Sequence, residues 1–138
     1  MVYFIDTNIF LRVLVKENEE TFKECSKILN LVRQNKISVF TSSLVLSEIE
    51  WVLESFYNFE KQKVITALES IINLKALKVV DKFNPRLALE IFQKKNVKFV
   101  DALIASNPAI FQKKVIIVSY DKDFDKISIK RAEPKEIR

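Results

Sequence analysis

Short apolar runs alternate with longer amphipathic segments along the chain. The runs at 2–5, 37–40, 77–80 and 115–118 lack strict polar alternation and are predicted to be buried strands, with a further short strand expected at 127–129. The hydrophobic periodicity predicts helices at 8–15, 19–35, 43–57, 60–73 and 99–106, and another that opens at Asn84 and Pro85. Strands separated by helices indicate a parallel sheet covered on both faces, which is a three-layer α/β/α domain.

The size and composition are those of one globular unit. A chain of 138 residues, of which 49% are hydrophobic and 30% charged, predicts a single domain spanning 1–138. No apolar stretch reaches the roughly 18 residues that a membrane span needs, and the N-terminus lacks a signal-peptide pattern. We therefore expect a cytoplasmic protein without membrane association, in agreement with a single cysteine, Cys25, that cannot form an internal disulfide.

Two residue types are absent, and their absence narrows the chemistry. Without histidine there is no Ser-His-Asp triad, no Cys-His pair and no histidine-ligated zinc site. Without glycine there is no phosphate-binding P-loop or dinucleotide fingerprint, and turns must be made by residues such as Asn, Asp and Lys. An enzyme of this composition would use carboxylates, and the net charge of +5 suits an anionic partner such as nucleic acid.

Acidic residues directly follow two of the predicted strands. Asp6 comes after the first strand, and Asp121 and Asp123 come shortly after the strand at 115–118. Because ligands of open parallel sheets bind beyond the carboxyl ends of the strands, we expect these groups to project from the same edge.

Two further acids lie beside apolar helix faces. Glu48 falls at the margin of the face formed by Val45, Ile49, Val52, Leu53 and Phe56. Asp101 is surrounded in the sequence by apolar neighbours. A carboxylate in such a place needs a partner, because an isolated buried charge is costly.

Each acid alone has an ordinary explanation as a helix cap, an ion-pair partner or part of an exposed turn. The four together favour a metal site, because neighbouring carboxylates repel by about 4 kcal/mol per pair and a divalent cation removes that repulsion. Oxygen ligands of this kind favour Mg²⁺ or Mn²⁺, the ions that hold phosphate oxygens.

The motifs "FIDTNIFLR", "TSSLVLSEIEWVL", "KFVDALIAS" and "VIIVSYDKDFDKI", with the trailing "RAEP", resemble those of PIN-domain nucleases. The resemblance covers nearly the whole chain and is to the VapC toxins of prokaryotic toxin–antitoxin pairs in particular. It implies a PIN fold with a central parallel sheet and a metal-dependent endoribonuclease.

The resemblance also implies roles for individual residues. The acidic site would comprise the catalytic and metal-binding residues Asp6, Glu48, Asp101 and Asp121. Asp6 and Asp101 would be the principal metal ligands, and Asp123 would substitute for or assist Asp121. Supporting positions are Thr7, Asn8 and Ser119. Candidates for phosphate contacts near the acids in sequence are Arg12, Lys98, Lys122 and Lys126, although solvated side chains are the more usual role of such residues.

The partners implied by the resemblance are an RNA substrate, a VapB-like antitoxin and a second copy of the chain in a homodimer. The aromatic residues Trp51, Phe56, Tyr57 and Phe59 permit an interface, but residues of this kind are more often core. Two other functions stay open: a non-catalytic RNA- or partner-binding module of the same fold, and a haloacid-dehalogenase-like phosphatase. The phosphatase usually has a second acid two residues after the first, where this chain has Asn8.

Overall fold

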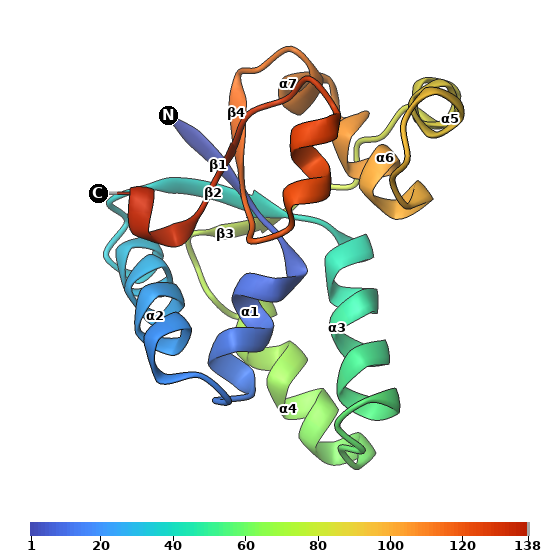
Figure 1. Ribbon diagram of the computed structural model, residues 1–138. Coiled ribbons are helices and arrows are strands. Elements are labelled where there is room, and N and C mark those ends of the chain that lie inside the picture. The colour runs from blue at the N-terminus through green and yellow to red at the C-terminus, as the bar shows by residue number, and fades with distance from the viewer. Residues whose placement is uncertain (138) are drawn as a thin grey trace.

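A five-stranded, all-parallel sheet forms the centre of the protein, in a computed structural model that describes residues 1–137 (Figure 1). The strands are β1 (Val2–Ile5), β2 (Ser38–Thr41), β3 (Leu77–Val79), β4 (Val115–Val118) and β5 (Arg131–Ala132). Their spatial order is β3-β2-β1-β4-β5, and every neighbouring pair is parallel. The predicted parallel sheet is confirmed.

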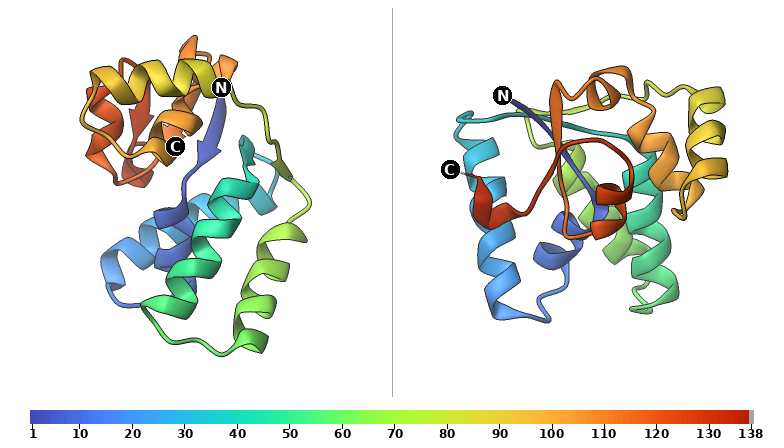
Figure 2. Two further views of the ribbon diagram at one scale, coloured as in Figure 1. Left: turned by 90° about the vertical axis from the view of Figure 1, so that its right-hand side faces the viewer. Right: turned by 45° about the horizontal axis from the view of Figure 1, so that its top comes forward.

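Seven α-helices cover the sheet of the described chain in two layers. They are α1 (Thr7–Leu14), α2 (Glu19–Arg33), α3 (Ser43–Ser55), α4 (Lys61–Ile72), α5 (Pro85–Lys94), α6 (Phe99–Ala105) and α7 (Pro108–Phe111), with 3₁₀ turns η1 (Lys122–Lys126) and η2 (Pro134–Glu136). Helices α1 to α4 lie on one face and α5 to α7 on the other, which gives the predicted three-layer α/β/α arrangement (Figure 2). The bounds of the predicted helices agree with the observed ones to within two residues.

Polar side chains make the turns that glycine makes in other proteins. Asn18, Ser42 and Asn84 each accept a hydrogen bond from a backbone N–H in the first turn of the helix that follows. Positive φ angles occur at Asn35, Asn58 and Lys113, in the left-handed region that glycine usually occupies. The expectation that Asn and Lys replace glycine in turns is confirmed.

The strand order reverses direction at the middle of the sheet. From β1 the chain builds outward to β2 and β3, and then crosses back to place β4 on the other side of β1. The carboxyl ends of β1 and β4 therefore flank a topological switch point, the place where open α/β sheets bind their ligands.

The expected strand at 127–129 is wrong, because the chain pairs with β4 only at Arg131–Ala132. Phe124 and Ile127 are buried through the 3₁₀ turn η1 rather than by a strand, so the alternating "ISI" pattern reflects packing of a loop. The short helix α7, opened by Asn107 and Pro108, was not predicted.

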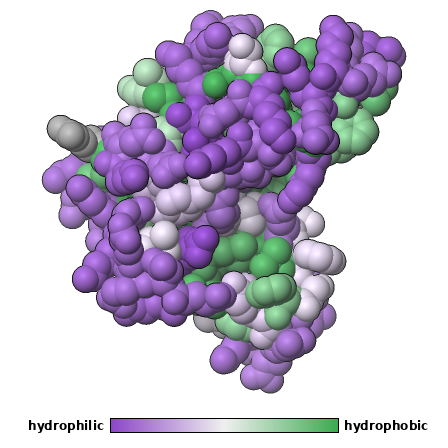
Figure 3. All heavy atoms as spheres, in the orientation of Figure 1, coloured by the Kyte–Doolittle hydropathy of each residue, from purple (hydrophilic) through white to green (hydrophobic). Residues whose placement is uncertain are grey.

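The aromatic residues after the middle of α3 are less buried than their type suggests. Trp51 is 64% exposed and Phe56 is 70% exposed, so the expectation that they belong to the core is wrong. Phe56 lies just beyond the end of α3 and packs edge to face on Tyr57, which is itself only partly buried. An apolar area is visible on the lower half of the molecule, in the region of α1 and α3 (Figure 3).

Among the described residues, no helix has both the length and the apolar character required to cross a membrane.

Candidate active site

Asp6 lies at the carboxyl end of the central strand. It stands between β1 and α1, its backbone N–H donates to the carbonyl of Val118 in β4 at 3.1 Å, and only 5% of the residue is exposed. Although Asp6 occupies the N-cap position of α1, its side chain makes no capping hydrogen bond. The carboxylate is thus directed to other groups at the switch point.

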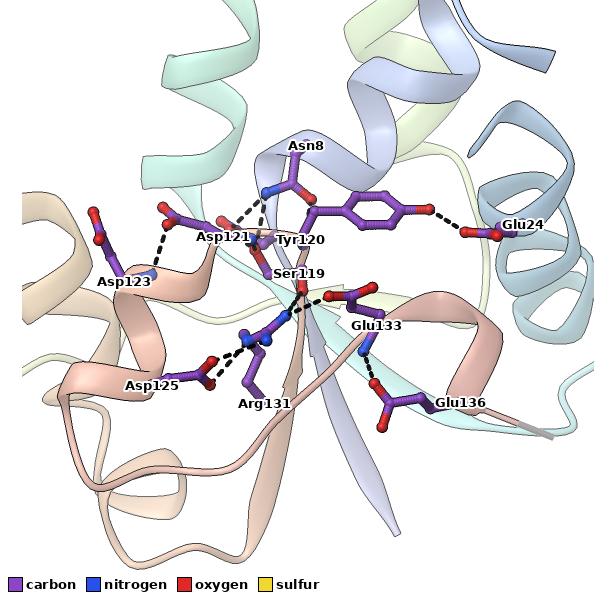
Figure 4. Close-up of polar contacts among 11 residues, drawn as sticks. Asn8, Glu24, Ser119, Tyr120, Asp121, Asp123, Asp125, Arg131, Glu133 and Glu136 are labelled. Atoms are coloured by element: carbon purple, nitrogen blue, oxygen red, sulfur yellow. Dashed lines mark hydrogen bonds and ion pairs between the residues drawn. The ribbon is translucent and has the colours of Figure 1, made fainter. Parts of the chain in front are cut away.

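Ser119, the first residue after β4, organises the surroundings of Asp6. Its hydroxyl donates to Oδ2 of Asp6 at 2.7 Å, and it accepts from the side-chain amide of Asn8 at 2.9 Å and from the backbone N–H of Asp121 at 3.0 Å (Figure 4). Asn8 also donates to Oδ2 of Asp6 at 3.2 Å and accepts from the backbone N–H of Tyr120 at 3.1 Å. The ends of β1 and β4 are therefore tied together, and one oxygen of Asp6 is fixed by two donors.

Helices on both faces of the sheet bring the remaining acids to this edge. A pocket of about 180 Å³ is lined by Asp6, Glu48 of α3, Asp101 of α6 and Asp121, together with Thr7, Asn8, Leu11, Val52 and Lys98. Four acids that are up to 115 residues apart in the chain thus share one small space, as the sequence predicts. Larger hollows occur elsewhere on the described surface, but they contain none of these four acids.

Burial and neighbouring negative charges raise the pKa values of two of the four acids. Burial is the main cause that raises the pKa of Asp101 from 3.8 to about 7, and the charges of Asp121 and Asp6 add to it, whereas Lys98 opposes it. Burial likewise raises the pKa of Asp6 to about 6, against the lowering effect of the Ser119 hydrogen bond. Burial and the neighbouring negative charges therefore outweigh the Lys98 charge and the Ser119 hydrogen bond.

Two buried polar atoms at this site lack a hydrogen-bond partner among the described residues. They are Oδ2 of Asp101 and the hydroxyl of Thr7, and both residues line the pocket. An unpartnered buried carboxylate oxygen among other acids is the arrangement that a bound cation relieves. The oxygen-only donor set suits Mg²⁺ or Mn²⁺ rather than a softer ion.

The two candidate acids after β4 occupy different positions. Oxygens of Asp101, Asp121 and Asp123 lie within 4.8 Å of one another. Asp121, however, lines the pocket, whereas Asp123 does not and its carboxylate pairs with Lys126 at 2.9 Å. Asp123 also donates its backbone N–H to Oδ1 of Asp121 at 2.9 Å, so it orients Asp121 through the backbone.

The predicted phosphate-binding cations are distributed unevenly. Lys98 lines the acid pocket, and Arg12 stacks over the ring of Tyr120 at 5.8 Å and lines the adjoining hollow. Lys126 is engaged by Asp123, and Lys122 is exposed outside the pocket. The structure therefore brings Lys98 to the acids but gives Lys122 and Lys126 no comparable place.

A buried arginine behind the site was missed by sequence reasoning. Arg131 makes a two-pronged ion pair with Asp125 at 2.9 Å, a second with Glu133 at 3.2 Å, and donates to the carbonyl of Ser119 at 2.9 Å (Figure 4). Its side chain is only 11% exposed. In the sequence Arg131 lies between Asp125 and Glu133, and this pattern of a cation between two acids could have indicated that it supports the residue after β4.

A second support reaches the site from α2. The hydroxyl of Tyr120 donates to Glu24 at 2.7 Å and lies 3.5 Å from the sulfur of Cys25. Tyr120 stands between Ser119 and Asp121, so this contact ties the site loop to the outer helix (Figure 4).

Comparison with known proteins places this arrangement in a family. The PIN domain family matches residues 3–130. The VapC ribonuclease of Aquifex aeolicus (strain VF5) is 27% identical over 135 residues, which are 96% of this chain and 96% of that protein.

Two solved structures share the fold. The structure of VapBC2 from Rickettsia felis bound to a DNA fragment from their promoter has a TM-score of 0.68 at 24% identity, over 96% of this chain and 98% of the other. Mycobacterium tuberculosis VapC20, a sarcin-ricin loop cleaving toxin, has a TM-score of 0.68 at 16% identity, over 97% of this chain and 100% of the other. Because the family match spans nearly the whole chain and coincides with an acid cluster at the switch point, the protein belongs to the PIN domain family.

Proposed function

We propose that the protein is a VapC-like endoribonuclease toxin that hydrolyses RNA phosphodiester bonds with the help of Mg²⁺ or Mn²⁺. The observation that carries the proposal is the buried oxygen of Asp101, which has no hydrogen-bond partner within residues 1–137 and lies in a pocket shared with three other acids. Membership of the PIN family and the similarity to a protein named as a VapC ribonuclease support it.

The residues that would hold the cation are Asp6, Asp101 and Asp121, with Glu48 completing the set directly or through water. The carboxylate oxygens of Asp101, Asp121 and Asp123, which lie within 4.8 Å of one another, repel by about 3.5 kcal/mol per pair at an effective dielectric constant of about 20. A bound Mg²⁺ would supply neutralisation of this charge, polarisation of a phosphodiester and a more acidic water.

The chain itself orients the acids and shapes the space between them. Ser119 and Asn8 hold one oxygen of Asp6, so its rotation is restricted before any ligand binds. Lys98 brings a positive charge to the pocket, where it can contact a phosphate oxygen. The hydroxyl of Thr7, buried without a partner among the described residues, is available to donate to a ligand oxygen.

We further propose a VapB-like antitoxin and a homodimer as the protein assemblies. A hollow beside the acid pocket is lined by Leu11, Arg12, Val15, Glu17 and Tyr57, and both spaces share Asn8 and Leu11. An antitoxin segment bound along this hollow would reach the acids and block RNA. VapBC2 of Rickettsia felis, a similar structure, is a complex of this kind by name.

The test is cleavage of a pool of structured RNAs by the purified protein. We expect discrete products with Mg²⁺, none with EDTA, and none from the Asp6→Asn and Asp101→Asn variants. The Glu69→Gln variant is the matched control, because this exposed carboxylate on α4 lies outside the pocket.

Products that persist in both aspartate variants would come from a contaminating nuclease and contradict the proposal. If Mg²⁺ raises the melting temperature but no RNA is cut, the protein is a metal-binding module without this activity. A phosphatase would instead release inorganic phosphate from a phosphomonoester, which the same preparations can be assayed for.

A further inference from the structure

A second hollow lies over the β2 and β3 side of the sheet, and none of the four site acids lines it. It has a volume of about 420 Å³, and its lining extends from Val2 and Ser38, at the starts of β1 and β2, across Lys78 of β3 to Val80 and Lys82 beyond the end of β3. Residues of α7 form its other side. Asp6 and Ser119, in contrast, follow the ends of their strands. The four-residue length of β1, at about 3.3 Å per residue, places the Val2 end of the hollow roughly 13 Å from the carboxyl end of that strand.

The hollow lies where one face of the sheet becomes less covered toward β3. Phe4, Phe40 and Lys78 are register partners on neighbouring strands, so their side chains lie on the same face. Phe4 of β1 is buried, Phe40 of β2 is partly exposed and Lys78 of β3 is exposed. Burial thus falls steadily from the sheet centre to its β3 edge, leaving a shallow floor beside α7.

The rim of this hollow is uniformly positive. Lys78, Lys82 and Lys114 line it, and its lining contains no acidic residue. All three lysines are exposed, and none forms an ion pair within residues 1–137. One further hollow shares Ser38 with it and is lined by Lys36, again without an acid.

The floor of the hollow is apolar and contains one aromatic ring. Val2, Phe40 and Val80 contribute to it, and Phe40 packs edge to face on the buried ring of Phe4, with 5.3 Å between ring centroids. Phe40 is thus a partly exposed ring that is fixed by packing on Phe4, and it lies beside several lysines. Proteins bind single-stranded nucleic acid with this combination, because bases stack on the ring and phosphates contact the cations.

We propose that this lysine-rimmed hollow binds a single-stranded segment of the RNA substrate away from the scissile bond. The inference rests on the proposed ribonuclease function and deepens it. The four acids of the pocket repel a polyanion until a cation is bound, so a second, positively charged surface would strengthen RNA binding beyond what Lys98 provides. The hollow is suited to this role because its cations are not neutralised by neighbouring acids. A second copy docked here would oppose lysines with lysines.

The test compares two triple variants of equal net charge. In one, Lys78, Lys82 and Lys114 become alanine; in the control, Lys27, Lys61 and Lys135 become alanine, which are exposed and line none of the described hollows. Binding of a labelled oligouridylate of about 12 nucleotides is measured in EDTA over a range of salt concentrations. Melting temperatures of both variants verify folding.

We expect the hollow variant to bind about tenfold more weakly than the control at low salt. The slope of log K against log salt concentration should fall by about 2, because each single-strand phosphate contact contributes about 0.7. Equal binding and equal slopes in the two variants would overturn the proposal. So would displacement of RNA by polyglutamate as readily as by oligouridylate, which would assign the hollow to an acidic peptide, or loss of a dimer only in the hollow variant.

Failure here and failure of the nuclease proposal are distinguishable. Binding in EDTA needs neither the metal nor cleavage, whereas the nuclease assay needs both. If the wild type cuts RNA but both triple variants bind RNA equally well, the nuclease proposal stands and only the proposal of this binding surface fails.

Discussion

Replacing Asp101 by asparagine should stabilise the metal-free protein at pH 8. Burial and the charges of Asp121 and Asp6 raise the pKa of Asp101 from 3.8 to about 7, so folding takes up a proton between these pH values. Stability therefore falls as the pH rises through this window, and the loss is complete above pH 7. Asparagine has a similar shape and no charge, and it avoids this loss.

The size of the effect follows from the same pKa values. At about 1.4 kcal/mol per pKa unit, the difference corresponds to about 4 kcal/mol for a fully desolvated group. Water at the open pocket screens the carboxylate, which reduces the figure to about 2 kcal/mol. For a chain of 138 residues this corresponds to a rise in melting temperature of about 7 °C.

Thermal melts in EDTA at pH 5 and pH 8 measure this directly. The melting temperature of Asp101→Asn should exceed that of the wild type by about 7 °C at pH 8 and by about 3 °C at pH 5. At pH 5 Asp101 is protonated in the folded wild type but ionised in the unfolded chain, so part of the difference remains. The Glu69→Gln control should show no gain at either pH. A lower melting temperature of Asp101→Asn at pH 8 would refute the reasoning, because it would mean that the carboxylate is stabilised by a partner within the protein.

Three further predictions concern the surroundings of the acids. Ser119→Ala should lower RNA cleavage by about 10- to 100-fold at a fixed Mg²⁺ concentration, because Asp6 loses its shorter side-chain hydrogen bond; an unchanged rate would remove Ser119 from the positioning role. Asp121→Asn should abolish cleavage whereas Asp123→Asn should keep most of it, since only Asp121 lines the pocket, and reversed initial rates would exchange their roles. Arg131→Met should lower the free energy of unfolding in urea by about 1–2 kcal/mol at pH 7, because it leaves acids and the Ser119 carbonyl without their donor, although Asp125 is half exposed to solvent. The difference should shrink as the pH falls below 3.8, since Arg131 lowers the pKa of Asp125, and a loss independent of pH would indicate packing instead.

The sheet and the meeting of the acids were accessible from sequence because they depend on local patterns. A buried run followed at once by Asp6, and another followed by Asp121, define two strand ends, and parallel strands bring such ends to one edge. Glu48 and Asp101 were found because a carboxylate beside an apolar helix face is costly without a partner.

The features that were missed depend on tertiary packing. The ladder to β4 forms at Arg131 rather than at 127–129, since the arginine is held there by acids on either side of it in the sequence. Phe56 is exposed because α3 ends at Ser55, one residue before the aromatic ring could join the helix face. Hydrophobic periodicity specifies neither the exact last residue of a helix nor the extent to which an arginine side chain is buried.

Anomalous diffraction from a crystal grown with Mn²⁺ would test most directly whether the four acids form a metal site. The account predicts a manganese peak between Asp6, Asp101 and Asp121, within about 2.5 Å of the Asp101 oxygen that has no partner in the described chain, and its loss in Asp101→Asn. A peak at Asp123 and Asp125 that is not bound by Asp6 or Asp101, or no peak at saturating Mn²⁺, would contradict it.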